Sequence, residues 1–137
     1  MATGFIGTPA ICHVLSDFGH NDLAYRLVSQ EECPSWLYPV KQGATTIWER
    51  WDGIKPNGTF QDPKMNSFNH YAYGAIGDWF YRVAAGIEVD PSKPGYKRIL
   101  IQPQPGGDID YVSASLETLH GQIASSWRLE GDSFHLD

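Results

Sequence analysis

The segment GATTIWERWDG, residues 43–53, shapes the interpretation of the whole chain, because it places a carboxylate between two tryptophans at the start of a loop. The β-branched residues before Trp48 predict an extended backbone over residues 44–48. Residues 50–65 then carry repeated glycine and proline and are predicted to form a long loop. Loops of this length are uncommon inside a compact domain and are often functional.

Glu49 is the candidate catalytic residue of this segment. Its apolar neighbours Trp48 and Trp51 act against the charged form of the carboxyl group, whereas Arg50 favours it. A carboxyl group in such surroundings, at the mouth of a loop, is a candidate general acid or base. The alternative from the residues alone is a surface glutamate paired with Arg50.

A second polar segment, NSFNHYAYG at residues 66–74, precedes an apolar helical pattern. Asn66 or Ser67 is predicted to cap a helix that runs to about Ala85. His70 then lies in the first turn, where the helix dipole disfavours the imidazolium form and leaves a neutral ring able to bond a sugar hydroxyl. The alternative is a core histidine.

Upstream of these segments the pattern is helical. Thr8 and Pro9 predict a helix start, apolar residues follow at helical spacing, and Gly19 ends the helix. A second helix is predicted from an Asn21 cap until Pro34, which makes an αα-hairpin. A short helical turn is expected within residues 35–42.

Downstream, alternating apolar residues predict β-structure. Strands are expected at 98–101, 111–118 and 122–129, with another beginning at Phe134, in an antiparallel meander. One helical hairpin with one further helix cannot close a helical layer, and a few strands make only half a sandwich. The expectation is therefore an α+β segment spanning two domains, residues 1–88 and 89–137.

Composition excludes several classes of function. The net charge is −6 with a pI near 5.2, so no basic stripe is available for nucleic acid or an anionic membrane. No apolar run approaches the roughly 20 residues that a membrane span needs. Cys12 and Cys33 are predicted to be buried free thiols, and no metal or organic cofactor is indicated. Neither the oligomeric state nor the cellular location is indicated.

Aromatic residues make up 13% of the chain, and three tryptophans, Trp36, Trp48 and Trp51, lie close together. Such clusters form either plain core or the flat apolar platforms on which sugar rings bind.

The two polar segments together resemble bacterial α-L-rhamnosidases of glycoside hydrolase family 78. The flanking segments that share this resemblance are TGFIGTP at 3–9, PSWLY at 34–38 and KRILIQP at 97–103. The resemblance covers nearly the whole chain and implies the last part of an (α/α)6 six-hairpin barrel followed by the first antiparallel strands of a C-terminal β-sandwich.

The resemblance implies an inverting hydrolase that releases terminal α-L-rhamnose from glycosides and rhamnose-bearing polysaccharides. It makes Glu49 the general base and His70 a contact of the bound sugar, with Trp48 and Trp51 walling or supporting the pocket. Asp52 is expected to orient the loop. The family's general acid lies in an upstream barrel segment, so the 137-residue chain alone is expected to be inactive.

Two other functions remain open at this stage. One is a noncatalytic carbohydrate-binding or interaction module that uses the aromatic cluster as a platform. The other is a six-hairpin glycosidase that acts on a different sugar, since one fold hosts many functions.

Overall fold

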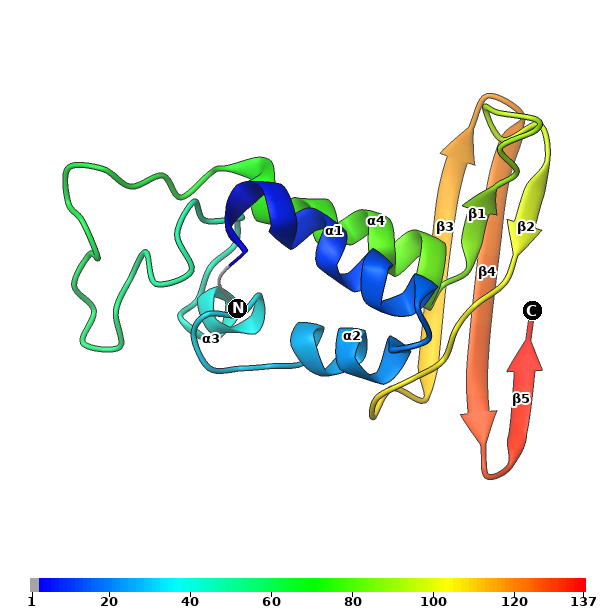
Figure 1. The fold of residues 1–137 in the computed structure, drawn as a ribbon, viewed down its shortest axis with the longest axis horizontal. Coiled ribbons are helices and arrows are strands. Elements are labelled where there is room, and N and C mark those ends of the chain that lie inside the picture. Colours follow the sequence, from blue (N-terminus) through cyan, green and yellow to red (C-terminus); the bar gives the residue numbers. More distant parts are fainter. Residues whose placement is uncertain (1–2) are drawn as a thin grey trace. The chain divides into compact units, whose positions relative to one another are not determined.

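The computed structural model describes residues 3–137 and has an α+β fold. The chain divides into two compact units, residues up to 76 and residues 77–137 (Figure 1). None of the helices within the described part is both long and apolar enough to span a membrane. The domain boundary between residues 88 and 89 stays a prediction.

The first unit begins with the expected helical hairpin, α1 (Gly4–Asp17) and α2 (Asn21–Val28). α1 begins earlier than predicted, and Pro9 lies inside it rather than at its start. Thr8 is not a cap: it is fully buried, and its hydroxyl bonds that of Thr3 at 2.8 Å. Gly19, with φ +80°, ends the hairpin's first helix as predicted.

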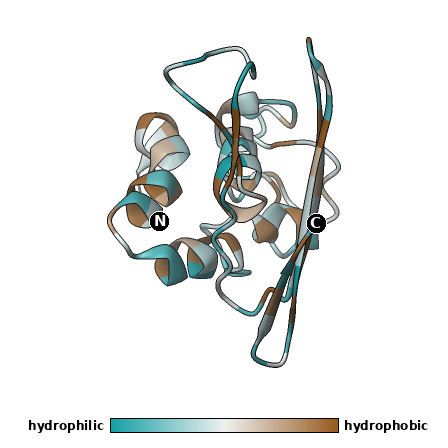
Figure 2. Ribbon diagram, turned by 90° about the vertical axis from the view of Figure 1, so that its right-hand side faces the viewer, coloured by the Kyte–Doolittle hydropathy of each residue, from teal (hydrophilic) through white to brown (hydrophobic). Residues whose placement is uncertain are grey.

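The face that α1 buries also differs from the predicted one. Phe18 is 78% exposed and Val14 is 51% exposed, whereas Thr8, Cys12 and Ser16 are buried. These small side chains recur every four residues and let a neighbouring helix approach closely, so they, rather than the larger residues, define the contact face. Figure 2 shows hydrophobic positions recurring along the hairpin beside polar ones.

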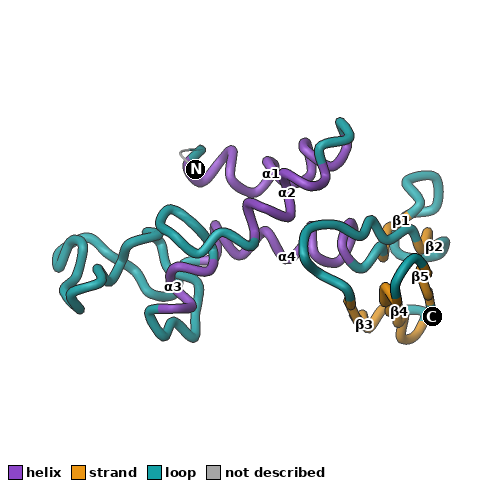
Figure 3. The backbone as a smooth tube through the Cα atoms, turned by 90° about the horizontal axis from the view of Figure 1, so that it is seen from below, coloured by secondary structure: helices purple, strands orange, loops and turns teal. Residues whose placement is uncertain are grey.

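α2 ends at Val28, well before Pro34, and residues 30–34 form a bend that the Gln30 side chain braces. The Gln30 side-chain amide donates to the carbonyls of Glu32 and Pro34. Cys12 is buried as predicted, but Cys33 lies in this exposed turn, so its predicted burial was wrong. Both thiols are free. The short helix α3 (Leu37–Lys41) follows, and the chain is then mostly loop until residue 70 (Figure 3).

The predicted helix over 66–85 begins later and is irregular. It consists of the 3₁₀-helix η1 (Tyr71–Ala75), α4 (Ile76–Trp79) and the π-helical turn η2 (Phe80–Ala84). Asn66 and Ser67 lie outside it, and His70 is the capping residue. The predicted extended stretch 44–48 contains no strand of a sheet.

The second unit holds two sheets. β1 (Ile87–Val89), which the sequence did not predict, pairs with β2 (Ile99–Ile101), so β2 does not belong to the meander. The three-stranded meander is confirmed for the remaining strands: β3 (Tyr111–Thr118), β4 (Gly121–Glu130) and β5 (Ser133–Leu136).

The core of the second unit forms around Trp127 of β4, which is 1% exposed. Its indole Nε1 donates to the carbonyl of Ala84 at 2.6 Å, and the Ser125 hydroxyl donates to the carbonyl of Ala85 at 2.8 Å. These bonds satisfy two carbonyls at the end of η2, where helical partners are missing. β4 is thereby fixed to the helix within this unit.

Candidate active site

Two backbone hydrogen bonds bring the predicted Glu49 and His70 segments together. The His70 amide donates to the carbonyl of Ile47 at 2.8 Å, and the Glu49 amide donates to the carbonyl of Ser67 at 2.8 Å. The Thr46 hydroxyl also donates to the carbonyl of Phe68. Residues 46–49 and 67–70 therefore run side by side, and the two candidate residues belong to one local structure.

The loop after Glu49 is held by bonds that converge on Gly53. Its carbonyl accepts from the Gln61 amide at 3.0 Å and from the Asn66 side-chain amide at 3.0 Å. A Cβ at Gly53 would lie 3.1 Å from the Phe68 ring and 3.2 Å from the Trp48 ring. Close packing thus fixes the base of this loop.

The Arg50 side chain bonds a backbone carbonyl instead of the Glu49 carboxylate. Its Nε donates to the carbonyl of Met65 at 3.1 Å, and no ion pair joins it to Glu49 among residues 3–137. The surface ion pair considered from the sequence is therefore absent from the described part of the chain. Glu49 instead borders an open cleft.

A row of aromatic rings runs behind this cleft. Trp51 stacks on Tyr73 with centroids 3.7 Å apart and planes 9° from parallel. Phe5 of α1 lies 5.3 Å from Tyr73 and stacks on His70 at 4.9 Å. Trp36 meets Trp51 edge to face at 5.4 Å. The row joins residues from α1, the segment before α3, the loop and η1.

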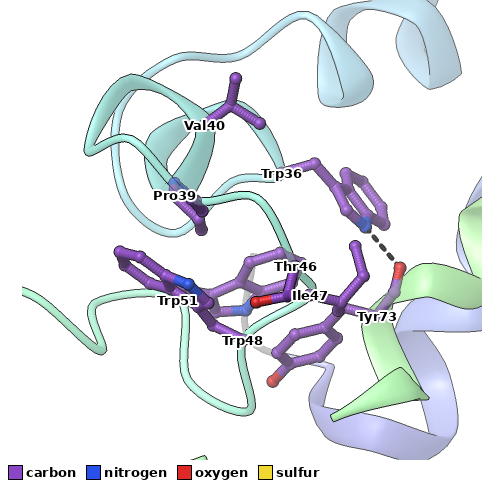
Figure 4. A pocket seen from close by; sticks show the side chains of 9 residues that line it. Trp36, Pro39, Val40, Thr46, Ile47, Trp48, Trp51 and Tyr73 are labelled. Atoms are coloured by element: carbon purple, nitrogen blue, oxygen red, sulfur yellow. Dashed lines mark hydrogen bonds between the residues drawn. The ribbon is translucent and has the colours of Figure 1, made fainter. Parts of the chain in front are cut away.

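Two clefts border the Trp51–Tyr73 pair. The first, of about 640 Å³ of space open to solvent, is lined by Phe5, Glu49, Arg50, Trp51, Asp52 and Tyr73. The second, of about 290 Å³, is almost wholly apolar and is shown in Figure 4; Trp36, Pro39, Ile47 and Trp48 are among its lining residues. Only the first cleft combines carboxylates with an aromatic wall, which makes it the candidate active site.

The predicted site residues occupy different positions around this cleft. Glu49 and Trp51 line it directly. Trp48 is 5% exposed, packs edge to face on Phe68 at 5.2 Å and lines the second, apolar cleft instead of the first. His70 reaches the cleft's wall through its stacking on Phe5.

His70 precedes its helix instead of lying in the first turn. Its Nδ1 accepts from the Ala72 amide at 3.4 Å and so caps η1. An accepting Nδ1 requires a lone pair there, which places the proton of a neutral ring on Nε2. In this arrangement Nε2 is the atom with which His70 can donate to a ligand.

Tyr73 and Phe5 are cleft residues to which sequence analysis gave no role. Burial and then the negative charge of Glu49 raise the pKa of the Tyr73 hydroxyl, so it stays protonated near neutral pH. The position of Tyr73 three residues after His70 was a usable signal. Nothing in the sequence pattern indicated that Phe5 would reach the same cleft.

Within residues 3–137, no group of three or more His, Cys, Asp or Glu side chains is arranged to hold a metal ion. The cleft and its wall offer carboxylates, an imidazole and aromatic faces. This combination suits proton transfer next to a ring-shaped polar ligand.

Two family models match the chain. Residues 1–84 match the bacterial alpha-L-rhamnosidase 6 hairpin glycosidase domain, and residues 86–137 match the bacterial alpha-L-rhamnosidase C-terminal domain. An alpha-L-rhamnosidase of Streptomyces avermitilis is 49% identical over 136 residues, which are 99% of this chain and 13% of the relative.

Solved structures agree with these matches. The structure of a Streptomyces avermitilis alpha-L-rhamnosidase complexed with L-rhamnose superposes with a TM-score of 0.90 at 50% identity, over 97% of this chain and 13% of that one. A native alpha-L-rhamnosidase from Aspergillus terreus gives 0.91 at 44% identity, over 97% and 15%. This chain thus spans only about an eighth to a seventh of its relatives' length. Matched along its length by both family models, the chain belongs to the bacterial alpha-L-rhamnosidase family.

Proposed function

We propose that this chain contributes the general base, Glu49, to the active site of an inverting α-L-rhamnosidase. The observation that carries the proposal is the position of Glu49 on an open cleft beside the stacked Trp51 and Tyr73 rings, without an ion pair to Arg50 in the described residues. Support also comes from the Streptomyces avermitilis relative, whose solved structure contains L-rhamnose.

Inversion needs two carboxyl groups on opposite faces of the sugar, roughly 6.5–9.5 Å apart. Glu49, as a carboxylate, takes a proton from a water molecule while the water oxygen bonds to the anomeric carbon. The glycosidic C–O bond breaks as a general acid protonates the leaving oxygen. We assign that acid to a residue of the complete enzyme outside these 137 residues.

The other site residues bind rather than transfer protons. His70 donates from Nε2 to a sugar hydroxyl, since its Nδ1 is engaged by the Ala72 amide. Trp51 presents an aromatic wall to the sugar ring, and the buried Trp48 supports the site indirectly through its packing on Phe68. Asp52 lines the same cleft and orients the loop. The substrates are rhamnose-containing glycosides or polysaccharides.

We also propose that residues 1–88 belong to the helical catalytic domain and residues 89–137 to the C-terminal β-sandwich. The separate family matches to 1–84 and 86–137 support this division.

Replacement of Glu49 in the complete enzyme tests the assignment. Glu49→Gln keeps the size of the side chain but cannot accept a proton, so kcat for an aryl α-L-rhamnoside should fall about 10²- to 10⁴-fold. Asp52→Asn is the matched control, because Asp52 lines the same cleft without a proposed role in proton transfer. It should lower kcat far less.

Azide distinguishes a missing base from a missing acid. In Glu49→Ala, azide ion can bond to the anomeric carbon without losing a proton, so it should restore turnover and give a rhamnosyl azide of inverted configuration. A Glu49→Gln enzyme within a few-fold of wild type would overturn the proposal. It would favour instead an aromatic cleft that binds sugar without catalysis.

A further inference from the structure

Trp36 contacts both segments of the candidate site without lining the Glu49 cleft. It lies directly before α3, and its indole Nε1 donates to the carbonyl of Tyr73 at 2.8 Å (Figure 4). Its ring also meets Trp51 edge to face, with planes 83° apart. Trp36 lines the second, apolar cleft, which also borders the Trp51–Tyr73 pair.

The two partners of Trp36 are close in sequence to the two candidate residues. Trp51 follows Glu49 by two positions, and Tyr73 follows His70 by three. Because Trp51 and Tyr73 also stack at 3.7 Å, the three side chains make a closed set of contacts. A displacement of Trp36 would therefore displace Trp51 and Tyr73, and with them the segments that carry Glu49 and His70.

The Tyr73 carbonyl, to which Trp36 donates, lies at the junction of two helical segments. The Tyr73 carbonyl also accepts from the Ile76 amide, at the step where η1 becomes α4. Trp36 uses the second lone pair of that oxygen. It thus fixes the 3₁₀ turn that begins at His70, whose own side chain caps the same turn.

We infer that Trp36 is a positioning residue for the hydrolytic reaction, holding the Glu49 carboxylate and the His70 imidazole in their relative positions through Trp51 and Tyr73. The inference rests on the proposed function of Glu49. Catalytic groups must be held closely, since a misplacement of about 1 Å can cost on the order of 10²-fold in rate.

The test is Trp36→Phe in the complete enzyme, which keeps an aromatic ring but removes the N–H donor. Trp127→Phe is the matched control, because Trp127 also donates its indole N–H to a backbone carbonyl, in the other compact unit. Both changes should lower the thermal unfolding midpoint. Only Trp36→Phe should lower kcat, by about 10-fold or more, with KM within about 3-fold of wild type.

A third variant, Trp36→His, restores an N–H donor at this position. It should recover part of the kcat lost in Trp36→Phe. If Trp36→Phe does not fold, Trp36→His is compared with Trp127→Phe instead. A kcat of Trp36→His below that of Trp127→Phe supports the inference, and an equal kcat contradicts it. Equal effects at positions 36 and 127 would overturn the inference and leave Trp36 a purely structural residue.

Glu49→Gln, assayed in parallel, separates this inference from the proposed function. A large loss of kcat in Glu49→Gln with an unaffected Trp36→Phe contradicts only the positioning role. An unaffected Glu49→Gln contradicts the proposed function itself, whatever Trp36→Phe does.

Discussion

Gly86 lies in close contact with the backbone of another segment. Its φ is +75°, and a Cβ there would lie 2.1 Å from the nitrogen of Pro103 and 2.5 Å from the carbonyl carbon of Gln102. Both atoms are backbone, so no side-chain rotation relieves the clash. The glycine is required for the close approach of the segment before β1 to the segment after β2.

Gly86→Ala should therefore destabilise the fold by more than about 3 kcal/mol, combining strain at positive φ with the steric clash. Gly131→Ala is the matched control: its φ is +58°, but nothing lies within 4 Å of the added Cβ. It should cost only about 1–2 kcal/mol. Urea unfolding followed by tryptophan fluorescence measures both. Equal losses of unfolding free energy in the two variants would show that the backbone at Pro103 moves aside at little energetic cost.

Glu49 and His70 could be singled out from the sequence because each lies in a short stretch of unusual local composition. Trp36, by contrast, acts on a carbonyl 37 residues away, and Phe5 meets His70 across most of the first unit. Such meetings depend on the tertiary path of the chain, which local patterns do not contain. The same limit explains why the sequence left open whether Trp48 walls or supports the pocket, whereas the structure places it in the core at 5% exposure.

Among the helices and strands, those whose ends are marked by a local sequence signal, such as a glycine or a tight turn, were predicted most accurately. Gly19 ends α1 by its positive φ, and the meander from Tyr111 to Leu136 follows from alternation and tight turns. The predicted helix over 66–85 was less accurate, because pairing of residues 67–70 with 46–49 delays its start until Tyr71. β1 is three residues long and carried too little alternation to be recognised.

The α1–α2 hairpin should lose stability in alkali. Burial raises the pKa of the Cys12 thiol from 9.0 to about 11 and that of the Tyr25 hydroxyl from 10.0 to about 12. The folded state holds these protons more tightly than the unfolded state, so their stabilising contribution is complete below about pH 9. It is lost as the pH rises through 11 and 12.

Urea unfolding at intervals from pH 7 to pH 11 measures this loss. In Cys12→Ala the decline of the free energy of unfolding above pH 9 should become shallower, because one of the two groups is gone. An unchanged slope would show that the Cys12 thiol ionises as readily in the folded state as in the unfolded one.

At the scale of the whole molecule, the family could be recognised from sequence because two long motifs occur together at a fixed separation. The fold class follows from that resemblance and is confirmed by the family matches and the α+β structure. The pairing of β2 with β1 could not be inferred in this way, since it depends on the close approach at Gly86 and Pro103.

The 137-residue chain, produced alone, should not hydrolyse an aryl α-L-rhamnoside at a measurable rate. Inverting hydrolysis needs both an acid and a base, and loss of one proton-transfer group alone costs about 10²- to 10⁴-fold. The chain spans 13% to 15% of the relatives it matches, and we assign the acid to a residue outside it. The assay compares the chain with the complete enzyme at equal concentration. Activity in the chain that Glu49→Gln abolishes would show that these residues contain an acid as well as a base.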